Sequence, residues 1–231
     1  MLRIVSFLCF ASLLLFQPLR AQEVNELMRR LRTQALQVKN YVATGTMKTQ
    51  VPFLRVPESP VTVYYKSPDR VKIKNEKGIS FIPKSAVGIN LSHLLNENDY
   101  NILDAGNEQV AQTKVRVVKL LPKDDNADLV LSTLYIDEGN TLILKAKTTT
   151  RENGSYQLEM TYGKYRSYGL PDNIVFTFNT RDYKLPKGIT FDFDDGAASQ
   201  KTTPRSNTGR ADIRLNAYTI NRGVPDDVFQ K

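Results

Sequence analysis

The sequence predicts a mainly β (α+β) fold: a curled antiparallel sheet that forms an incomplete barrel, with an N-terminal helix and a helical lid over an apolar cavity. Three observations lead to this prediction. Short stretches of alternating apolar and polar residues recur along most of the chain, as in strands with one buried face. Turn residues separate these stretches, and Asn153-Gly154 is the strongest hairpin signal. Only two stretches have the spacing of an amphipathic helix.

The chain begins with the pattern of a secretory signal. Arg3 precedes a largely apolar run of 13 residues from Ile4 to Phe16, and the helix breaker Pro18 precedes Ala21. This pattern predicts a signal peptide over residues 1–21, cleaved after Ala21, and a mature protein in the periplasm. A membrane-spanning helix needs about 20 apolar residues, so an uncleaved anchor is the weaker alternative.

Composition restricts the function of the remaining chain, which we expect to be a single domain over residues 22–231. The net charge is +8, or +6 without Arg3 and Arg20, and charges of both signs are mixed along the chain. We therefore expect no nucleic-acid partner, although a basic surplus favours contact with anionic membrane surfaces. Cys9 is the only cysteine and lies in the signal, so the mature chain can form neither a disulfide nor a thiolate metal site.

The N-terminal helix is predicted from apolar residues that recur every three or four positions. These residues are Val24, Leu27, Met28, Leu31, Ala35 and Val38. Polar and charged residues fill the other face, so we expect one apolar stripe packed on a sheet. A helix lying on a membrane surface is the alternative.

Alternation from Tyr41 onward predicts nine to eleven consecutive antiparallel strands. The clearest are Val61–Lys66, Arg70–Lys74, Ile79–Ile82, Lys114–Leu121, Leu129–Ile136, Leu142–Thr149, Tyr156–Tyr162, Ile174–Asn179 and Ile213–Ile220. A twisted sheet of this size curls on itself, and its concave apolar face has to be covered by another layer.

A second helical stretch, which Ser85 can cap, interrupts the strands and supplies the predicted lid. Its lid residues are Val87, Leu91 and Leu95. Residues 194–210 are polar, contain glycine, serine and proline, and have no apolar period. They are predicted to form a mobile loop inside the domain.

Aromatic residues occupy many of the alternating strand positions, with 11 tyrosines, 10 phenylalanines and no tryptophan in the chain. Core packing is one interpretation of them, and the lining of a cavity for an apolar ligand is the other. Alternation gives the following candidates for a ligand-binding lining: Val63, Tyr65, Val71, Ile73, Phe81, Leu142, Leu144, Tyr156, Leu158, Met160, Phe176 and Phe178.

No catalytic or cofactor motif stands out in the sequence. It has no Gly-x-Ser-x-Gly elbow, phosphate loop or dinucleotide fingerprint. His93 is the only histidine, and Asp192, Asp194 and Asp195 lack the spacing of a calcium loop. The sequence therefore predicts a protein that is not an enzyme and has no cofactor or metal site.

The order of elements, together with several short segments, resembles the LolA/LolB lipoprotein-carrier superfamily over nearly the whole mature chain. The segments are Lys66-Ser67-Pro68 followed by Arg70-Val71-Lys72, Lys77 to Pro83, Thr133 to Asp137, and Asn221 to Asp226 with Phe229. The resemblance implies a half-barrel whose cavity holds the acyl chains of a lipoprotein or another lipid. Ser67 stands where the best-known carrier has an arginine that helps close the lid.

These observations predict a monomeric periplasmic carrier that binds lipoprotein acyl chains or another lipid. Its finer form is delivery of lipoproteins to the outer membrane, with an inner-membrane release complex and an outer-membrane acceptor as partners. Two alternatives stay open. One is a sensor or interaction module of the same fold that binds an envelope lipid or protein, and the other is an envelope hydrolase.

Overall fold

The computed structural model describes residues 17–51, 54–55, 57–75, 94–96, 98–152, 154–179 and 208–230. Several predicted features lie outside these residues: the signal up to residue 16, the strand Ile79–Ile82 with Phe81, the lid residues Val87 and Leu91, His93, the aspartates 192, 194 and 195, and residues 194–207. The predictions made for them are therefore not examined by the structure.

One long helix, two short 3-10 helices and eleven strands make up the described chain. The helices are α2 (Gln17–Leu36), η2 (Arg166–Tyr168) and η3 (Asp226–Phe229). The strands are β1 (Asn40–Val51), β2 (Leu54–Arg55), β3 (Ser59–Lys66), β4 (Arg70–Asn75), β5 (Tyr100–Val110), β6 (Thr113–Pro122), β7 (Leu129–Asp137), β8 (Leu142–Thr150), β9 (Gly154–Thr161), β10 (Asn173–Asn179) and β11 (Thr208–Ile220).

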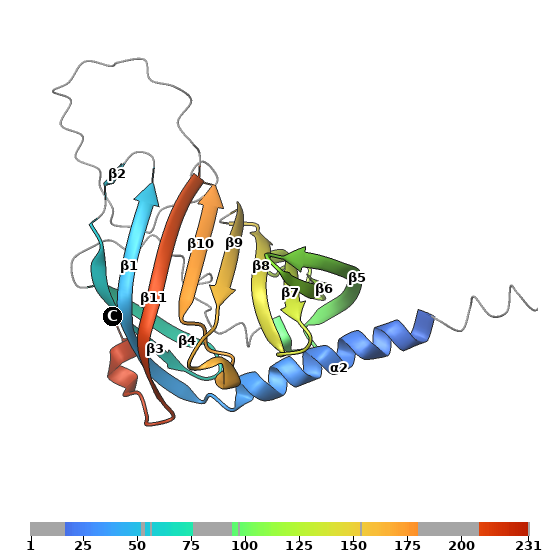
Figure 1. Ribbon diagram of the computed structural model, residues 1–231, viewed down its shortest axis with the longest axis horizontal. Helices are drawn as coiled ribbons and strands as arrows, with labels where there is room; N and C mark the ends of the chain where they lie inside the picture. Colours follow the sequence, from blue (N-terminus) through green and yellow to red (C-terminus); the bar gives the residue numbers. More distant parts are fainter. Residues whose placement is uncertain are drawn as a thin grey trace, which may run out of the picture.

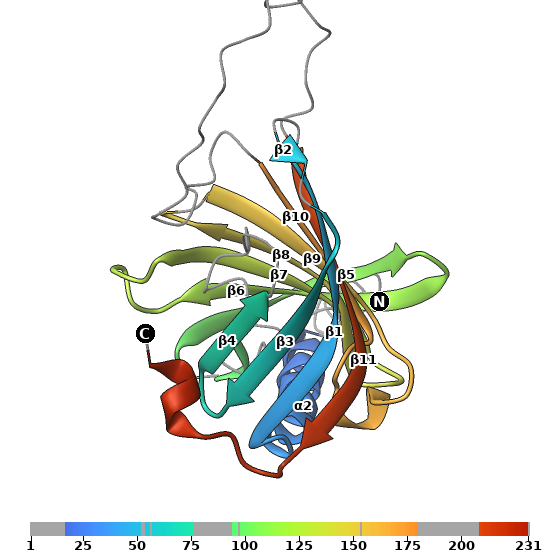
Figure 2. The same ribbon diagram turned by 90° about the vertical axis from the view of Figure 1, so that its left-hand side faces the viewer.

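All strands belong to one antiparallel sheet. Its order is β4-β3-β1-β11-β10-β9-β8-β7-β6-β5, and β2 pairs with β1 beside this path. Within the described residues β4 and β5 are the two edges and do not pair with each other. The sheet curls around α2, which lies on its concave side (Figures 1 and 2). The predicted incomplete barrel with an N-terminal helix is therefore confirmed.

The sequence did not predict the strands β1 and β5, because bulges break the alternation of apolar and polar residues in both of them. In β1 the register shifts between Thr44 and Gly45. A Cβ on Gly45 would lie 1.8 Å from the carbonyl oxygen of Arg214 on β11, so only glycine fits this close approach. In β5 the register shifts between Asp104 and Asn107, next to Gly106 with its positive φ of 84°.

The predicted loop over residues 194–210 runs too far. β11 begins at Thr208, and Thr208, Gly209 and Arg210 pair with β10. These three residues have no apolar alternation, and alternation was the pattern from which strands were predicted. Gly209 leaves room for the ring of Phe178, because a Cβ at this position would lie 2.3 Å from it.

The concave face is built from cross-strand rows of side chains. One row runs through eight strands in register: Asp104, Val118, Leu134, Ala146, Leu158, Phe176, Ala211 and Thr49. All residues between its two ends are apolar. The stripe of α2 packs on this face, with Val24, Leu27, Met28 and Leu31 in the same buried cluster. Each such side chain contributes about 1.5–3 kcal/mol when it leaves water.

Candidate ligand-binding interior

Ten of the twelve predicted lining residues lie on the concave side of the sheet. Seven of them are buried in the main core: Val63, Tyr65, Tyr156, Leu158, Met160, Phe176 and Phe178. Val71 and Ile73 are partly buried and pack against this core, and Leu142 is buried where it lines the void next to α2. Whether they contact a ligand stays a prediction. Phe81 lies outside the described residues.

Leu144 lies on the wrong face for this role. The register between β7 and β8 shifts after Tyr135, so that Ile136 pairs with Ile143 while Tyr135 pairs with Lys145. This bulge turns Ile143 toward the main core, and Leu144 packs in a second cluster with Tyr135 on the outer face of the sheet. Since a one-residue shift reverses the side-chain parity of a strand, strict alternation assigned the wrong face.

Little space is left between α2 and the sheet within the described residues. The void there is about 50 Å³. Its walls include Leu31 and Val38 from the helix side and Leu142, Met160 and Leu170 from the sheet side. A dry cavity of about 150 Å³ holds one benzene molecule, so this void is too small for an acyl chain. Two predicted lining residues, Tyr156 and Phe178, line a separate space of about 480 Å³.

A larger space of about 340 Å³ lies beside the C-terminal end of α2, and we call it the vestibule. Its lining residues are Arg32, Ala35, Leu36, Tyr65, Ser67, Pro68, Asp69, Leu95, Asn96 and Asp99. Ala35 and Leu95 line the inner void as well, and so they separate the two spaces. Leu95 is the only predicted lid residue within the described chain, and it is buried here.

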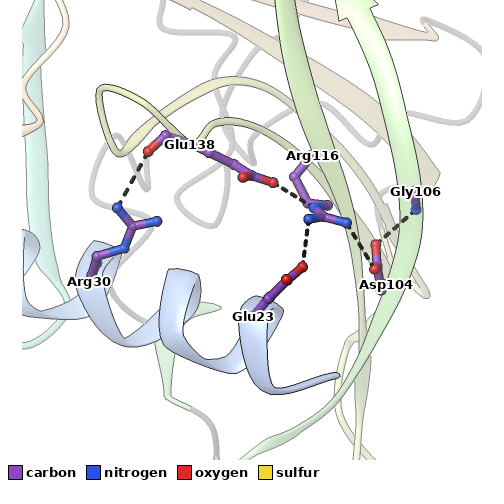
Figure 3. Close-up of polar contacts among 6 residues, drawn as sticks. All are labelled: Glu23, Arg30, Asp104, Gly106, Arg116 and Glu138. Carbon is purple, nitrogen blue, oxygen red and sulfur yellow. Dashed lines mark hydrogen bonds and ion pairs between the residues drawn. The ribbon is translucent and has the colours of Figure 1, made fainter. Parts of the chain in front are cut away.

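An arginine on the concave face fastens the N-terminal half of α2 (Figure 3). The Arg116 side chain of β6 is 12% exposed and contacts carboxylates from three elements. Its Nε donates to Glu138 at 2.5 Å, its Nη1 to Asp104 at 3.2 Å and its Nη2 to Glu23 of α2 at 3.3 Å. The hydrogen bond to Glu138 raises the pKa of the Arg116 guanidinium. Arg30 of α2 also donates to the Glu138 carbonyl oxygen, at 3.5 Å.

Sequence reasoning missed this network, although β6 carried a signal for it. Arg116 has the same parity as Val118 and Leu120, which are fully buried, so alternation alone places its charge on the concave face. Its partners come from positions 23, 104 and 138, and nothing in the local sequence connects them.

Neutral hydrogen bonds hold the C-terminal end of α2. The Gln34 amide donates to the carbonyl oxygens of Arg166 and Ser167 at 3.4 and 3.3 Å. Asn221, which follows β11, accepts the Lys39 N–H at 2.8 Å through its Oδ1 and donates to the Gln37 carbonyl oxygen at 2.8 Å. Its positive φ of 55° is a conformation that asparagine tolerates better than most residues. Asn221 therefore ties the helix end to the last strand.

Tyrosines form the concave wall next to this end. The Tyr41 ring lies 5.2 Å from the ring of Tyr65 and 5.3 Å from that of Tyr218. Burial raises the pKa of Tyr41 well above its ordinary value, and it raises the pKa of Tyr156, farther along the face, to about 12. The Tyr41 hydroxyl is fully buried and has no hydrogen-bond partner among the described residues. A polar ligand group would relieve this unsatisfied hydroxyl.

Two searches of the described chain concern metals and membranes. No group of three or more histidine, cysteine, aspartate or glutamate side chains in it is arranged to hold a metal ion. None of its helices has the length and hydropathy needed to cross a membrane.

Comparison with solved structures identifies proteins of the same fold. A domain from Vibrio parahaemolyticus described as an outer membrane lipoprotein-sorting protein has a TM-score of 0.56, is 11% identical and aligns over 89% of this chain and 95% of its own. A DUF1329 family protein from Desulfovibrio piger has a TM-score of 0.57 at 11% identity, with 90% and 96% covered. A LolA superfamily protein from Nitrosomonas europaea has a TM-score of 0.55 at 11% identity, with 88% and 97% covered.

The likeness to the LolA superfamily expected from the sequence is therefore confirmed for the fold. No protein-family model matches the sequence, and no curated protein matches it.

Proposed function

We propose that this protein is an exported carrier that shields a lipid, or the acyl chains of a lipoprotein, on the concave face of its sheet. The observation that carries the proposal is the composition of that face. An uninterrupted row of apolar side chains crosses six neighbouring strands from Val118 to Ala211, and an amphipathic helix covers it. In its described part the sheet stays unclosed between β4 and β5.

Loading requires α2 to separate from the sheet, because the enclosed void is only about 50 Å³. The ligand chain then replaces the helix stripe against the same apolar surface. Each methylene of the chain that leaves water contributes about 0.8 kcal/mol, which offsets the loss of contacts made by Leu27, Met28 and Leu31. The vestibule beside Leu95 is the side from which the void is reached.

Native mass spectrometry of the protein purified from the periplasm, together with displacement of a fluorescent fatty acid, tests the proposal. Co-purified lipid and saturable displacement are the expected results. The matched variants are Leu31→Phe, on the void side of α2, and Asn25→Phe, on its exposed side. The first should weaken probe binding about tenfold or more, as overpacked sites do, and the second should leave it unchanged. Absence of both lipid and displacement in the wild-type protein overturns the proposal.

Export is part of the proposal and has its own test. Cleavage after Ala21 makes Gln22 the first residue and leaves Glu23, a ligand of Arg116, in the first turn of the helix. A negative charge near a helix N-terminus is favourable. N-terminal sequencing of protein from the periplasmic fraction should give Gln22, and full-length protein in the membrane fraction would instead support the anchor.

In its finer form, the proposal assigns lipoproteins as cargo, received from an inner-membrane release complex and passed to an outer-membrane acceptor. Incubating loaded protein with acceptor membranes and following acylated cargo in the supernatant tests this form. Transfer of free fatty acid without transfer of lipoprotein would support a general lipid carrier and contradict delivery of lipoproteins.

A further inference from the structure

The outer face of the sheet presents a group of cations beside exposed leucines on β5 to β8. We call it the outer patch, and it consists of Leu103, Lys119, Leu121, Tyr135, Lys145 and Lys147. The strand register brings these residues close together. Leu103 on β5 lies opposite Lys119 on β6. Thr133 on β7 lies between Lys119 and Lys147 of β8, because it is opposite both of them. The neighbouring residues of opposite parity, such as Leu120 and Ala146, belong to the main core.

Two of the lysines are held above one aromatic ring. The ammonium groups of Lys145 and Lys147 lie 5.2 and 5.6 Å from the centre of the Tyr135 ring. Cation–π attraction fixes both charges on the same side of the sheet, where they repel each other. Glu159 lies opposite Lys145 in register, but its carboxylate accepts the Gln157 amide at 2.7 Å.

Glu159, opposite Lys145 in register, is the acidic side chain that faces these lysines across the neighbouring strand of the described sheet. No ion pair joins Lys119, Lys145 or Lys147 to a described carboxylate. The described residues of β6 and β8 contain no acidic side chain at all. The outer patch therefore keeps a surplus of positive charge. The surface is thus complementary to an external anion.

Exposed leucines favour a bilayer over a dissolved polyanion as that partner. Leu103 is 50% exposed and Leu121 is 36% exposed, and they lie on either side of Lys119. Aliphatic side chains next to lysines are typical of surfaces that sit at the boundary between headgroups and acyl chains. A soluble polyanion would use the cations and gain nothing from the leucines.

We propose that the outer patch docks the protein on a bilayer containing anionic phospholipids. Leu103 and Leu121 enter the headgroup boundary, and Lys119, Lys145 and Lys147 contact lipid phosphates. Docking through the outer face leaves the concave face and the vestibule free, so the protein can exchange a ligand while it stays on the membrane. This inference concerns a different surface from the proposed ligand-binding interior and does not depend on it.

Sedimentation with vesicles tests the inference on the intact mature protein. Vesicles of phosphatidylcholine in which about one lipid in three is the anionic phosphatidylglycerol are compared with vesicles of phosphatidylcholine alone. The wild-type protein should bind the anionic vesicles, and binding should weaken as salt is raised. The triple variant Lys119→Gln, Lys145→Gln and Lys147→Gln should bind about 100-fold more weakly, at about fivefold per lysine.

A matched triple variant controls for net charge. Lys39→Gln, Lys164→Gln and Arg222→Gln removes three exposed cations elsewhere and should keep most of the binding. If both triple variants lose vesicle binding equally, net charge alone explains the binding, and the proposed docking site is wrong. Failure of the wild-type protein to bind anionic vesicles would overturn it as well.

The leucines distinguish a bilayer from other anionic partners. Leu103→Ser with Leu121→Ser leaves the charge unchanged and should weaken vesicle binding about tenfold, because two apolar side chains no longer enter the bilayer. Binding to a soluble polyanion such as heparin that matches or exceeds vesicle binding, and is indifferent to these leucines, contradicts the inference. Circular dichroism checks the fold of each variant, and displacement of the fatty-acid probe should be unchanged in all of them.

Discussion

The two ends of helix α2 are attached to the sheet by different chemistry. Near its N-terminus, Glu23 and Arg30 join a network of charges centred on Arg116. At its C-terminus, neutral groups make the contacts, through the Gln34 amide and through Asn221. The first attachment depends on ionic strength and the second does not. Between them the helix is held by its apolar stripe, the surface that a ligand would have to replace.

Because its two ends are attached differently, we expect α2 to separate from the sheet at one end first. Covalent continuity with β1 and the hydrogen bonds of Asn221 fix its C-terminal end. The N-terminal end depends on a side chain network in which Glu23 is 60% exposed and free to turn toward water. Separation from the sheet should therefore begin at the N-terminal end.

The largest expected effect is that of removing the centre of the charged attachment. Arg116→Met leaves Asp104, whose side chain is 16% exposed, and Glu138 without their cation. We expect a loss of about 3 kcal/mol in the free energy of unfolding, measured by urea denaturation. Arg29→Met is the control, because it removes a pair with Glu26 in which both side chains are more than half exposed, and it should cost less than about 1 kcal/mol. Equal costs would show that Arg116 is an ordinary surface cation.

The neutral attachment is tested at Asn221. Asn221→Ala removes the side-chain hydrogen bonds to the α2–β1 connection and places alanine at a φ of 55°. We expect a loss of about 2 kcal/mol in the free energy of unfolding, from hydrogen bonds and left-handed strain together. Asn221→Gly loses the same hydrogen bonds without the strain, so it should be about 1 kcal/mol more stable than the alanine variant. If the alanine variant has the same free energy of unfolding as the wild-type protein, the Asn221 side chain does not hold the C-terminal end of α2.

Salt should loosen one end of α2 and not the other. Raising NaCl from about 0.05 to about 0.5 M shortens the Debye length severalfold. Amide exchange near Val24 should accelerate about threefold, equivalent to roughly 0.6 kcal/mol for an exposed ion pair, while exchange near Gln34 stays unchanged. Hydrogen-exchange mass spectrometry measures both in one experiment. A uniform response along the helix would contradict the assigned difference.

The smallest effect concerns a third ionic attachment, which joins the C-terminal segment to the sheet. The carboxylate of Asp226 accepts hydrogen bonds from Lys66 and Arg70, and these lower its pKa below the ordinary value. A carboxyl whose pKa is lowered by folding stabilises the fold above its unfolded pKa of about 3.9 and loses this contribution as the pH falls through the lower folded value.

Acidification below about pH 4 should therefore release the segment around η3, seen as faster amide exchange at Phe229. Asp226→Asn should exchange fast at neutral pH and show no further acid step. An acid step that persists in this variant would assign the effect to another carboxyl.

Much of the fold followed from local sequence patterns. Val24, Leu27, Met28 and Leu31 are buried on one side of α2 as their spacing predicted, because a helix repeats every 3.6 residues wherever it packs. Alternation likewise located eight of the eleven described strands. It failed in β1 and β5, where bulges interrupt the period.

The sequence by itself determined a curled antiparallel sheet with an amphipathic helix to cover it, since periodicity is a local property that any packing partner must respect. Only the tertiary structure decided which surface each side chain meets. The bulge in β8 moved Leu144 to the outer face, the fold brought Glu23, Asp104 and Glu138 to Arg116, and the packing of α2 left only a small void against the sheet. These outcomes depend on register and on contacts between distant segments, and no local pattern encodes either of them.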